Sequence, residues 1–337
     1  DLFASINLQA DEVIFGRYYE ASLSVLHNVQ NYENSTTMGR PGMNKKIVNS
    51  YLMADGSRFT DKAGYETMTF DQECQNRDPR LAQTIRTPGY TRIGSTKKEA
   101  PNLAYTMTGY HLIKYSMTAN YDEYNKSCND IPLFRTAEVY LNFAEAKAEL
   151  GTLKQADINK SIKLLRDRVG MTNLDMELAN SKPDPYLMSA ATGYPNVKGA
   201  NQGVILEIRR ERTIELAMEG FRYYDIMRWK EGKLFENDLL GIYVPGPGTY
   251  DLDKDGTDDV CFYVGTKPAG NVPLYLEIGE QIRLSNGESG YIICHSLITK
   301  KWNEDRDYLY PVPISERTLS NGVITQNPGW NDGLNFN

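Results

Sequence analysis

The sequence has few of the residues from which most catalytic and zinc sites are built. Its three histidines lie in none of the motifs of serine hydrolases or zinc proteases: His27, His111 and His295. Its four cysteines are far apart and lack the C-x-x-C spacing of a zinc site. One pair could bridge in an oxidising compartment, but a chain of 337 residues does not need disulfides to fold, so we expect free, packed thiols.

Long apolar runs and blocks of basic residues are also missing. No run approaches the roughly 20 apolar residues needed to span a bilayer, and the chain does not begin with a signal peptide. A formal net charge of -7 without a Lys/Arg cluster argues against nucleic acid or an acidic membrane surface as the partner. Hydrophobic residues still make up 40%, enough for the core of a globular protein that is either intracellular or a processed or partial chain.

The most ordered pattern in the chain is the stretch 205–229. Four apolar side chains recur there with helical spacing: Ile214, Ala217, Met218 and Phe221. Asn201 is a suitable N-cap residue for this helix, and Gly220 is a suitable stop or kink. The pattern predicts a helix that buries one face.

The same stretch carries an acidic residue at every fourth position: Glu207, Glu211, Glu215 and Glu219. Stacked carboxylates can bind a metal pair, but helical-bundle sites of that kind use Glu-x-x-His, which is absent. Basic residues lie between and beside them: Arg209, Arg210, Arg212 and Arg222. We therefore interpret the pattern as a structural ion network, extended by Asp225 and Arg228, with Trp229 closing the hydrophobic end of the helix.

The segment from Glu211 to Trp229 resembles the signature of the SusD/RagB family, the outer-membrane nutrient-binding lipoproteins of Bacteroidetes. Five further segments match the family in the same order: residues 76–81, 136–146, 164–170, 309–313 and 326–330. The segment 10–15 resembles the part of a family member that follows its helical N-terminal portion. The resemblance thus covers nearly all of this chain but only the C-terminal part of a member.

This resemblance implies a mainly α fold of TPR-like helical repeats with large irregular loop insertions and a few short strands. It implies a cell-surface lipoprotein of the outer membrane, held through an N-terminal lipid anchor ahead of this chain. Such a protein captures an oligosaccharide, less often a peptide or glycoprotein, and delivers it to a SusC-type TonB-dependent transporter, with no reaction and no cofactor. Two alternatives are a glycan-active hydrolase, whose carboxylate pair has no local signature, and a TPR-like scaffold that binds protein.

The pattern changes twice along the chain, which predicts three regions. Residues 1–131 form a loop-rich segment with short strands and part of the ligand-binding region. Residues 132–232 form a TPR-like helical core. One helix has an apolar stripe at Leu141, Ala144 and Ala148 and ends at Gly151. The next has a stripe at Ile158, Ile162, Leu165 and Val169 and ends at Gly170. Residues 233–337 form an irregular region that packs on the helices through a Pro-rich tail.

Sugar binding in surface loops relies on aromatic rings that stack on pyranose faces, with polar side chains that bond the hydroxyls. The chain has 23 tyrosines but only 3 tryptophans, and Trp229 and Trp330 belong to the motifs above. We expect the ligand aromatics among four loop residues, although each could instead be a packed core ring: Tyr65, Tyr90, Tyr105 and Trp302.

The sharpest local motif is the acidic run 251–259. Asp251, Asp253 and Asp255 stand at positions 1, 3 and 5 of a calcium loop, Gly256 is at position 6, and Asp259 is at position 9. Position 12 is Phe262 in place of the usual Glu. The spacing predicts one structural Ca²⁺, bound by these four carboxylates and the Thr257 carbonyl; the alternative is a solvated acidic turn between two strands.

Overall fold

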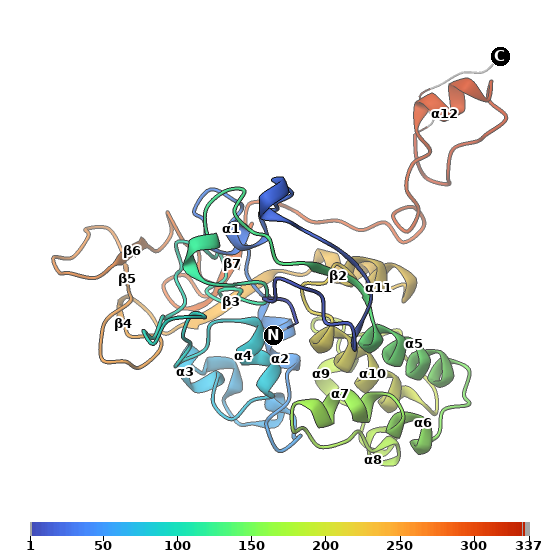
Figure 1. Ribbon diagram of the computed structural model, residues 1–337, viewed down its shortest axis with the longest axis horizontal. Coiled ribbons are helices and arrows are strands. Elements are labelled where there is room, and N and C mark those ends of the chain that lie inside the picture. The colour runs from blue at the N-terminus through green and yellow to red at the C-terminus, as the bar shows by residue number, and fades with distance from the viewer. Residues whose placement is uncertain (1, 332, 334–337) are drawn as a thin grey trace.

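The computed structural model describes residues 2–331 and 333 (Figure 1). Helix makes up 31% and strand 14% of it, so the fold is mixed and the prediction of a mainly α protein is right only in part. The α-helices of the described residues are α1 (Val29–Glu33), α2 (Lys45–Ser50), α3 (Phe70–Glu73), α4 (Pro79–Thr84), α5 (Thr136–Glu149), α6 (Gln155–Asn159), α7 (Ile162–Arg168), α8 (Met176–Ser181), α9 (Pro185–Met188), α10 (Gln202–Glu215), α11 (Arg222–Arg228) and α12 (Ile314–Leu319). The 3-10 helices are η1 (Ala21–Leu23), η2 (Phe59–Asp61), η3 (Tyr65–Thr67), η4 (Ala119–Tyr121) and η5 (Gly232–Glu236).

In the part of the chain that the structure describes, the strands form three small sheets: β1 (Val13–Arg17), β2 (Ile131–Arg135), β3 (Leu239–Val244), β4 (Gly248–Tyr250), β5 (Val260–Tyr263), β6 (Leu274–Glu277) and β7 (Gly290–Cys294). The pairs β1–β2 and β3–β7 are antiparallel, as is β4–β5, whereas β5–β6 is parallel. The strand predicted near residues 291–294 is therefore present as β7. The strand predicted over 111–116 is reduced to an isolated bridge between Leu112 and Ile85.

Helix α10 lies between two hydrophobic cores. Its N-terminal residues Val204, Leu206 and Ile208 are fully buried in a helical core formed mainly with α5, α7 and α8. Its C-terminal residue Ile214 belongs to a second core, built from α2, α4 and the strands β3 and β5. Gly203 permits the close approach of α8, because a Cβ there would lie 1.9 Å from the Ala179 carbonyl oxygen. The helix therefore joins the two halves of the molecule.

The structure does not show the predicted TPR-like repeats. Helices α5 and α10 each have 14 residues, but the helices that follow them are short, with 5 residues in α6 and 7 in α11. The helix predicted from Ile158 to Val169 is broken at Ser161, whose hydroxyl donates to the Asp157 carbonyl at 2.7 Å. A local side-chain hydrogen bond of this kind competes with helical bonding. The predicted stop at Gly151 is confirmed by its left-handed backbone (φ 68°).

The predicted helix over 205–229 is two helices. Helix α10 ends at Glu215, and the left-handed backbone of Met218 (φ 66°) and Gly220 (φ 85°) turns the chain before α11. The predicted apolar stripe through Ala217 and Phe221 is therefore wrong as a helical face. Asn201 is at the N-cap position, but its amide donates to the Ala148 carbonyl instead of capping.

The C-terminal tail leads away from the body of the molecule, and α12 lies apart from the other helices at the upper right (Figure 1). This differs from the tail expected to lie across the helices. Contacts with the body are made before α12: the Tyr308 hydroxyl accepts from the Gly232 amide at 2.9 Å. Within the described residues no helix combines the length and the apolar character required to cross a bilayer.

All four cysteines are free thiols, as predicted: Cys74, Cys128, Cys261 and Cys294.

Candidate functional site

The acidic ladder of α10 is buried and fully paired with cations. Glu215 accepts from Arg80 at 3.1 Å, from Arg135 at 2.9 Å and from Arg168 at 2.8 Å. Burial alone would raise the pKa of Glu215, but the three guanidinium groups outweigh it and hold that pKa well below its usual range. Glu211 is bonded likewise by Arg80 and Arg166, at 2.6 and 2.8 Å. The ladder is therefore a structural ion network, as predicted.

Most of the partners in this network differ from those expected. The arginines that pair with Glu211 and Glu215 come from α4, β2 and α7, not from α10 itself. Arg210 pairs with Asp184 and also with Glu207 of its own helix, at 3.2 Å. Arg212 bonds both carboxylate oxygens of Asp225 at 2.8 Å, so the network extends through Asp225 as predicted. Glu211 and Glu215 lie four residues apart on one face of α10 and point toward neighbouring segments. The packing of these segments therefore determines which arginines pair with them.

Tyr65 lies in a half-buried cluster of tyrosines that sequence reasoning missed. Its ring centroid is 6.5 Å from that of Tyr186, and Tyr291, which packs at 5.9 Å on Tyr243, donates its hydroxyl to the Glu66 carbonyl at 2.6 Å. Burial raises the pKa of Tyr65, Tyr186 and Tyr291. No short sequence signal links these rings, because they come from four separated segments.

Tyr90 and Tyr105 are half-buried and pack against basic or histidine side chains. The Arg86 guanidinium lies 5.4 Å from the Tyr90 ring centroid, and the Tyr105 ring lies 5.8 Å from that of His111. Tyr90 also lines a cavity of about 850 Å³ beside the ion network. Among the described residues, no ring contact joins any two of the four predicted ligand aromatics, so the structure does not gather them into one site.

Trp302 belongs to an aromatic cluster at the surface, which we call the Trp302 cluster. Its members are Tyr223, Tyr224, Phe235, Trp302, Tyr308 and Tyr310. The Trp302 ring lies 5.3 Å from Phe235 and 5.0 Å from Tyr308, and 65% of Tyr224 and of Tyr310 is exposed. The six rings thus form a chain of aromatic contacts that reaches the surface at Tyr224 and Tyr310.

A cavity of about 700 Å³ adjoins this cluster. Apart from Trp302, every residue that lines it is polar or charged: Lys233, Glu236, Lys301, Asn303, Glu304 and Arg306. Both polar groups of the Trp302 backbone form hydrogen bonds. The amide donates to Glu236 at 2.8 Å, and the carbonyl accepts from Lys233 at 3.0 Å. The indole also packs on Gly232, where an added Cβ would lie 2.0 Å from the ring. The ring is thus fixed at the edge of the cavity.

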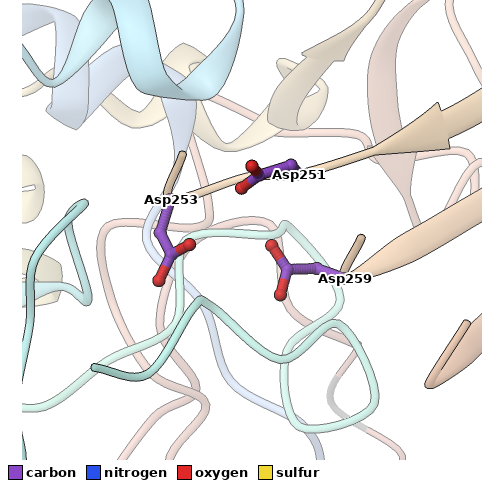
Figure 2. Close-up of side chains that lie close together, drawn as sticks. All are labelled: Asp251, Asp253 and Asp259. Atoms are coloured by element: carbon purple, nitrogen blue, oxygen red, sulfur yellow. The ribbon is translucent and has the colours of Figure 1, made fainter. Parts of the chain in front are cut away.

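The acidic run 251–259 forms the loop between β4 and β5, and Figure 2 shows three of its carboxylates turned toward one another. Oxygens of Asp251, Asp253 and Asp259 lie within 4.8 Å of one another. Burial and the neighbouring carboxylates raise the pKa of Asp259 to about 6 and raise that of Asp253. The remaining predicted side chain, Asp255, accepts from the Thr257 amide at 2.8 Å and is not part of the group.

Comparisons with a family model and with solved structures agree with this fold. The SusD family model matches residues 11–330. A SusD-like protein from Bacteroides fragilis superimposes with a TM-score of 0.59 and 21% identity over 97% of this chain. A SusD-like carbohydrate binding protein from the same organism gives 0.55 and 22% over 91%. At these identities the likeness shows the fold alone.

This chain spans only 57% and 53% of the lengths of those two proteins, as the motifs predicted. The search of curated proteins found no match. The motif resemblance is confirmed by the family model, which covers nearly the whole sequence. The chain belongs to the SusD family.

Proposed function

We propose that this chain binds an oligosaccharide at the Trp302 cluster without transforming it. The observation that carries the proposal is the cavity of about 700 Å³ in which one indole adjoins a lining of Lys, Glu, Asn and Arg side chains. Two findings support it: the SusD family consists of non-catalytic carbohydrate-binding proteins, and one structural relative is described as a carbohydrate binding protein.

The chemistry of this cavity suits a sugar. A pyranose ring presents C–H groups on its faces, which pack on an aromatic ring, and hydroxyl groups at its rim, which need donors and acceptors. Lys233 and Arg306 supply donors, while Glu236 and Glu304 supply acceptors. A shallow site that immobilises a flexible oligosaccharide gains little net free energy, so we expect a Kd in the micromolar to millimolar range.

We further propose that the complete protein acts at the cell surface. The SusD family is associated with the outer membrane. Delivery of the captured glycan to a SusC-type TonB-dependent transporter, and attachment through an N-terminal lipid anchor, are the roles that the family resemblance implies for a longer chain. Neither role requires a chemical step at the Trp302 cluster.

The binding test is a screen of the purified protein against plant, host and microbial glycans, with retention and product formation measured together. Retention without products is expected. For a retained glycan, Trp302→Ala should weaken binding at least tenfold, because the stacking surface is lost. Gly232→Ala should also weaken it, because the new Cβ displaces the indole. Phe143→Ala, which removes an exposed ring of α5, is the matched control and should bind normally.

Two results would contradict this assignment. Product formation would indicate a hydrolase. Normal glycan retention by folded Trp302→Ala protein, together with loss of retention in Tyr65→Ala, would move the site to the tyrosine cluster around Tyr65 and Tyr186.

A further inference from the structure

We propose that the loop 251–259 binds one Ca²⁺ through the carboxylates of Asp251, Asp253 and Asp259, and that this ion fixes the loop between strands β4 and β5. The geometry brings together oxygens from three side chains within 4.8 Å of one another, each on a backbone that the hairpin fixes. The inference is independent of glycan binding.

The hairpin itself places the outer two ligands. Strands β4 and β5 pair up to Tyr250 and Val260, and the Asp259 amide continues the ladder by donating to the Tyr250 carbonyl at 2.9 Å. Asp251 and Asp259 therefore face each other at the open end of the pair. Between them, left-handed backbone at Lys254 (φ 59°) and Gly256 (φ 92°) folds the loop back, so that Asp253 points into the same space (Figure 2).

Backbone amides orient each of the three carboxylates. The Leu252 amide donates to Asp259 at 2.7 Å, the Gly256 amide donates to Asp251 at 2.9 Å, and the Asp255 amide donates to Asp253 at 3.2 Å. The Asp255 amide also lies 3.2 Å from the second oxygen of Asp251, whereas only one oxygen of Asp253 and one of Asp259 accept such bonds. Orientation by fixed amides makes the carboxylates ready to bind without a large loss of side-chain freedom.

The decisive observation is Asp253. This residue is only 7% exposed, and its Oδ2 atom has no hydrogen-bond partner among the described residues. Within that part of the chain, no Lys or Arg forms an ion pair with Asp251, Asp253 or Asp259. An unpaired, buried carboxylate oxygen beside two further carboxylates is costly unless a cation fills the space between them.

The donor set favours calcium over other ions. Carboxylate oxygens without histidine or cysteine suit a hard cation, and they exclude the usual zinc ligands. A loop with three carboxylates and open sides leaves room for waters and carbonyls, as the six to eight oxygens around Ca²⁺ require, whereas Mg²⁺ demands strict octahedral geometry. With only three protein carboxylates, we expect a Kd of about 10⁻⁴ to 10⁻³ M.

The ion would act on the fold through β5. Val260 and Phe262 of this strand are buried in the core shared with α10, so a loop fixed by Ca²⁺ would hold that strand in place. Ligand binding to the native state alone raises the unfolding temperature by mass action. At 10 mM Ca²⁺ the expected rise is about 2 °C or more for a chain of this size.

The test is thermal unfolding of the whole chain after EDTA treatment, then with 10 mM CaCl2, 10 mM MgCl2 or NaCl of equal ionic strength. Calcium should raise the Tm more than the other two salts. Asp253→Asn should lose the calcium response and Asp258→Asn, an exposed Asp of the same loop, should keep it. Calorimetric titration with Ca²⁺ gives the same comparison directly, and Asp259→Asn serves as a second ligand variant. Equal responses to the three salts, or equal calcium responses of Asp253→Asn and Asp258→Asn, would overturn the proposal.

Discussion

Helix α10 and the β4–β5 loop each bring several carboxylates close together, but their negative charge is balanced in different ways. Around α10, Glu215 is bonded by three arginines and Glu211 by two. In the loop, Asp251, Asp253 and Asp259 approach one another without an arginine or lysine partner among the described residues. The carboxylates of α10 are neutralised by side chains of the protein itself, whereas we propose that those of the loop bind a cation from solution. Carboxylate spacing alone therefore does not distinguish a structural network from a metal site; the cations around it do.

The strongest test of this comparison removes a carboxylate from the complete network. Glu215→Ala leaves the buried groups of Arg80 and Arg135 with one partner fewer, so we expect a loss of about 4 kcal/mol in the free energy of unfolding. Denaturant titration measures it, with Glu177→Ala on the exposed side of α8 as the control. A Glu215→Ala protein as stable as the control would show that the network is dispensable.

Glu33 is an intermediate case, a fully buried acid that forms no ion pair within the described part of the chain. Burial raises its pKa to about 7, although hydrogen bonds from Ser116 and Tyr115 and the charges of Arg92 and Arg86 oppose the shift. Below about pH 4.5 both the folded and the unfolded state hold the proton, so nothing is lost. Between pH 4.5 and 7 only the unfolded state releases it, and stability falls as the pH rises.

Replacement of Glu33 by the isosteric Gln removes this pH dependence. Glu33→Gln should match the parent at pH 4.5 and exceed it by about 3 kcal/mol at pH 8, since 2.5 pKa units correspond to roughly that free energy. Denaturant titration at the two pH values measures the difference. A variant that gains as much at pH 4.5 as at pH 8 would mean that packing, not ionisation, is responsible.

Removal of a carboxylate charge from the acidic loop should stabilise the protein, whereas removal of one from α10 should destabilise it. In EDTA, Asp253→Asn removes an unpaired buried charge, so we expect the variant to be more stable than the parent by about 1 kcal/mol. Asp258→Asn, which lies exposed in the same loop, should change stability less. A loss of stability in calcium-free Asp253→Asn would show that its carboxylate has a favourable partner.

The smallest effect is expected at an exposed pair. Lys163 and Asp167 form an ion pair on α7, but their side chains are 41% and 49% exposed. Water screens such a pair, so Asp167→Asn should cost less than about 0.5 kcal/mol. A cost similar to that of Glu215→Ala would show that burial does not separate the two classes of carboxylate.

The sequence by itself determined the family, the order of its motifs and the spacing of acids in the two regions. Local rules account for this success. Gly151 ends α5, and the chain turns between Asp251 and Gly256, because in both places a glycine adopts the left-handed backbone conformation that is required. Local chemistry also broke one prediction, since the Ser161 hydroxyl interrupts the stripe from Ile158 to Val169.

Only the tertiary structure decided which charges and rings meet. Arg80 and Arg135 reach Glu215 across 135 and 80 residues of chain, and Trp302 packs on Phe235 although the strands β3 to β7 lie between them in the sequence. Such contacts depend on how segments pack, and helical periodicity gives only the direction in which a side chain leaves its own helix. For the same reason the sequence could name the aspartates of a calcium loop but not that Asp253 is buried without a partner: burial is a property of the neighbours.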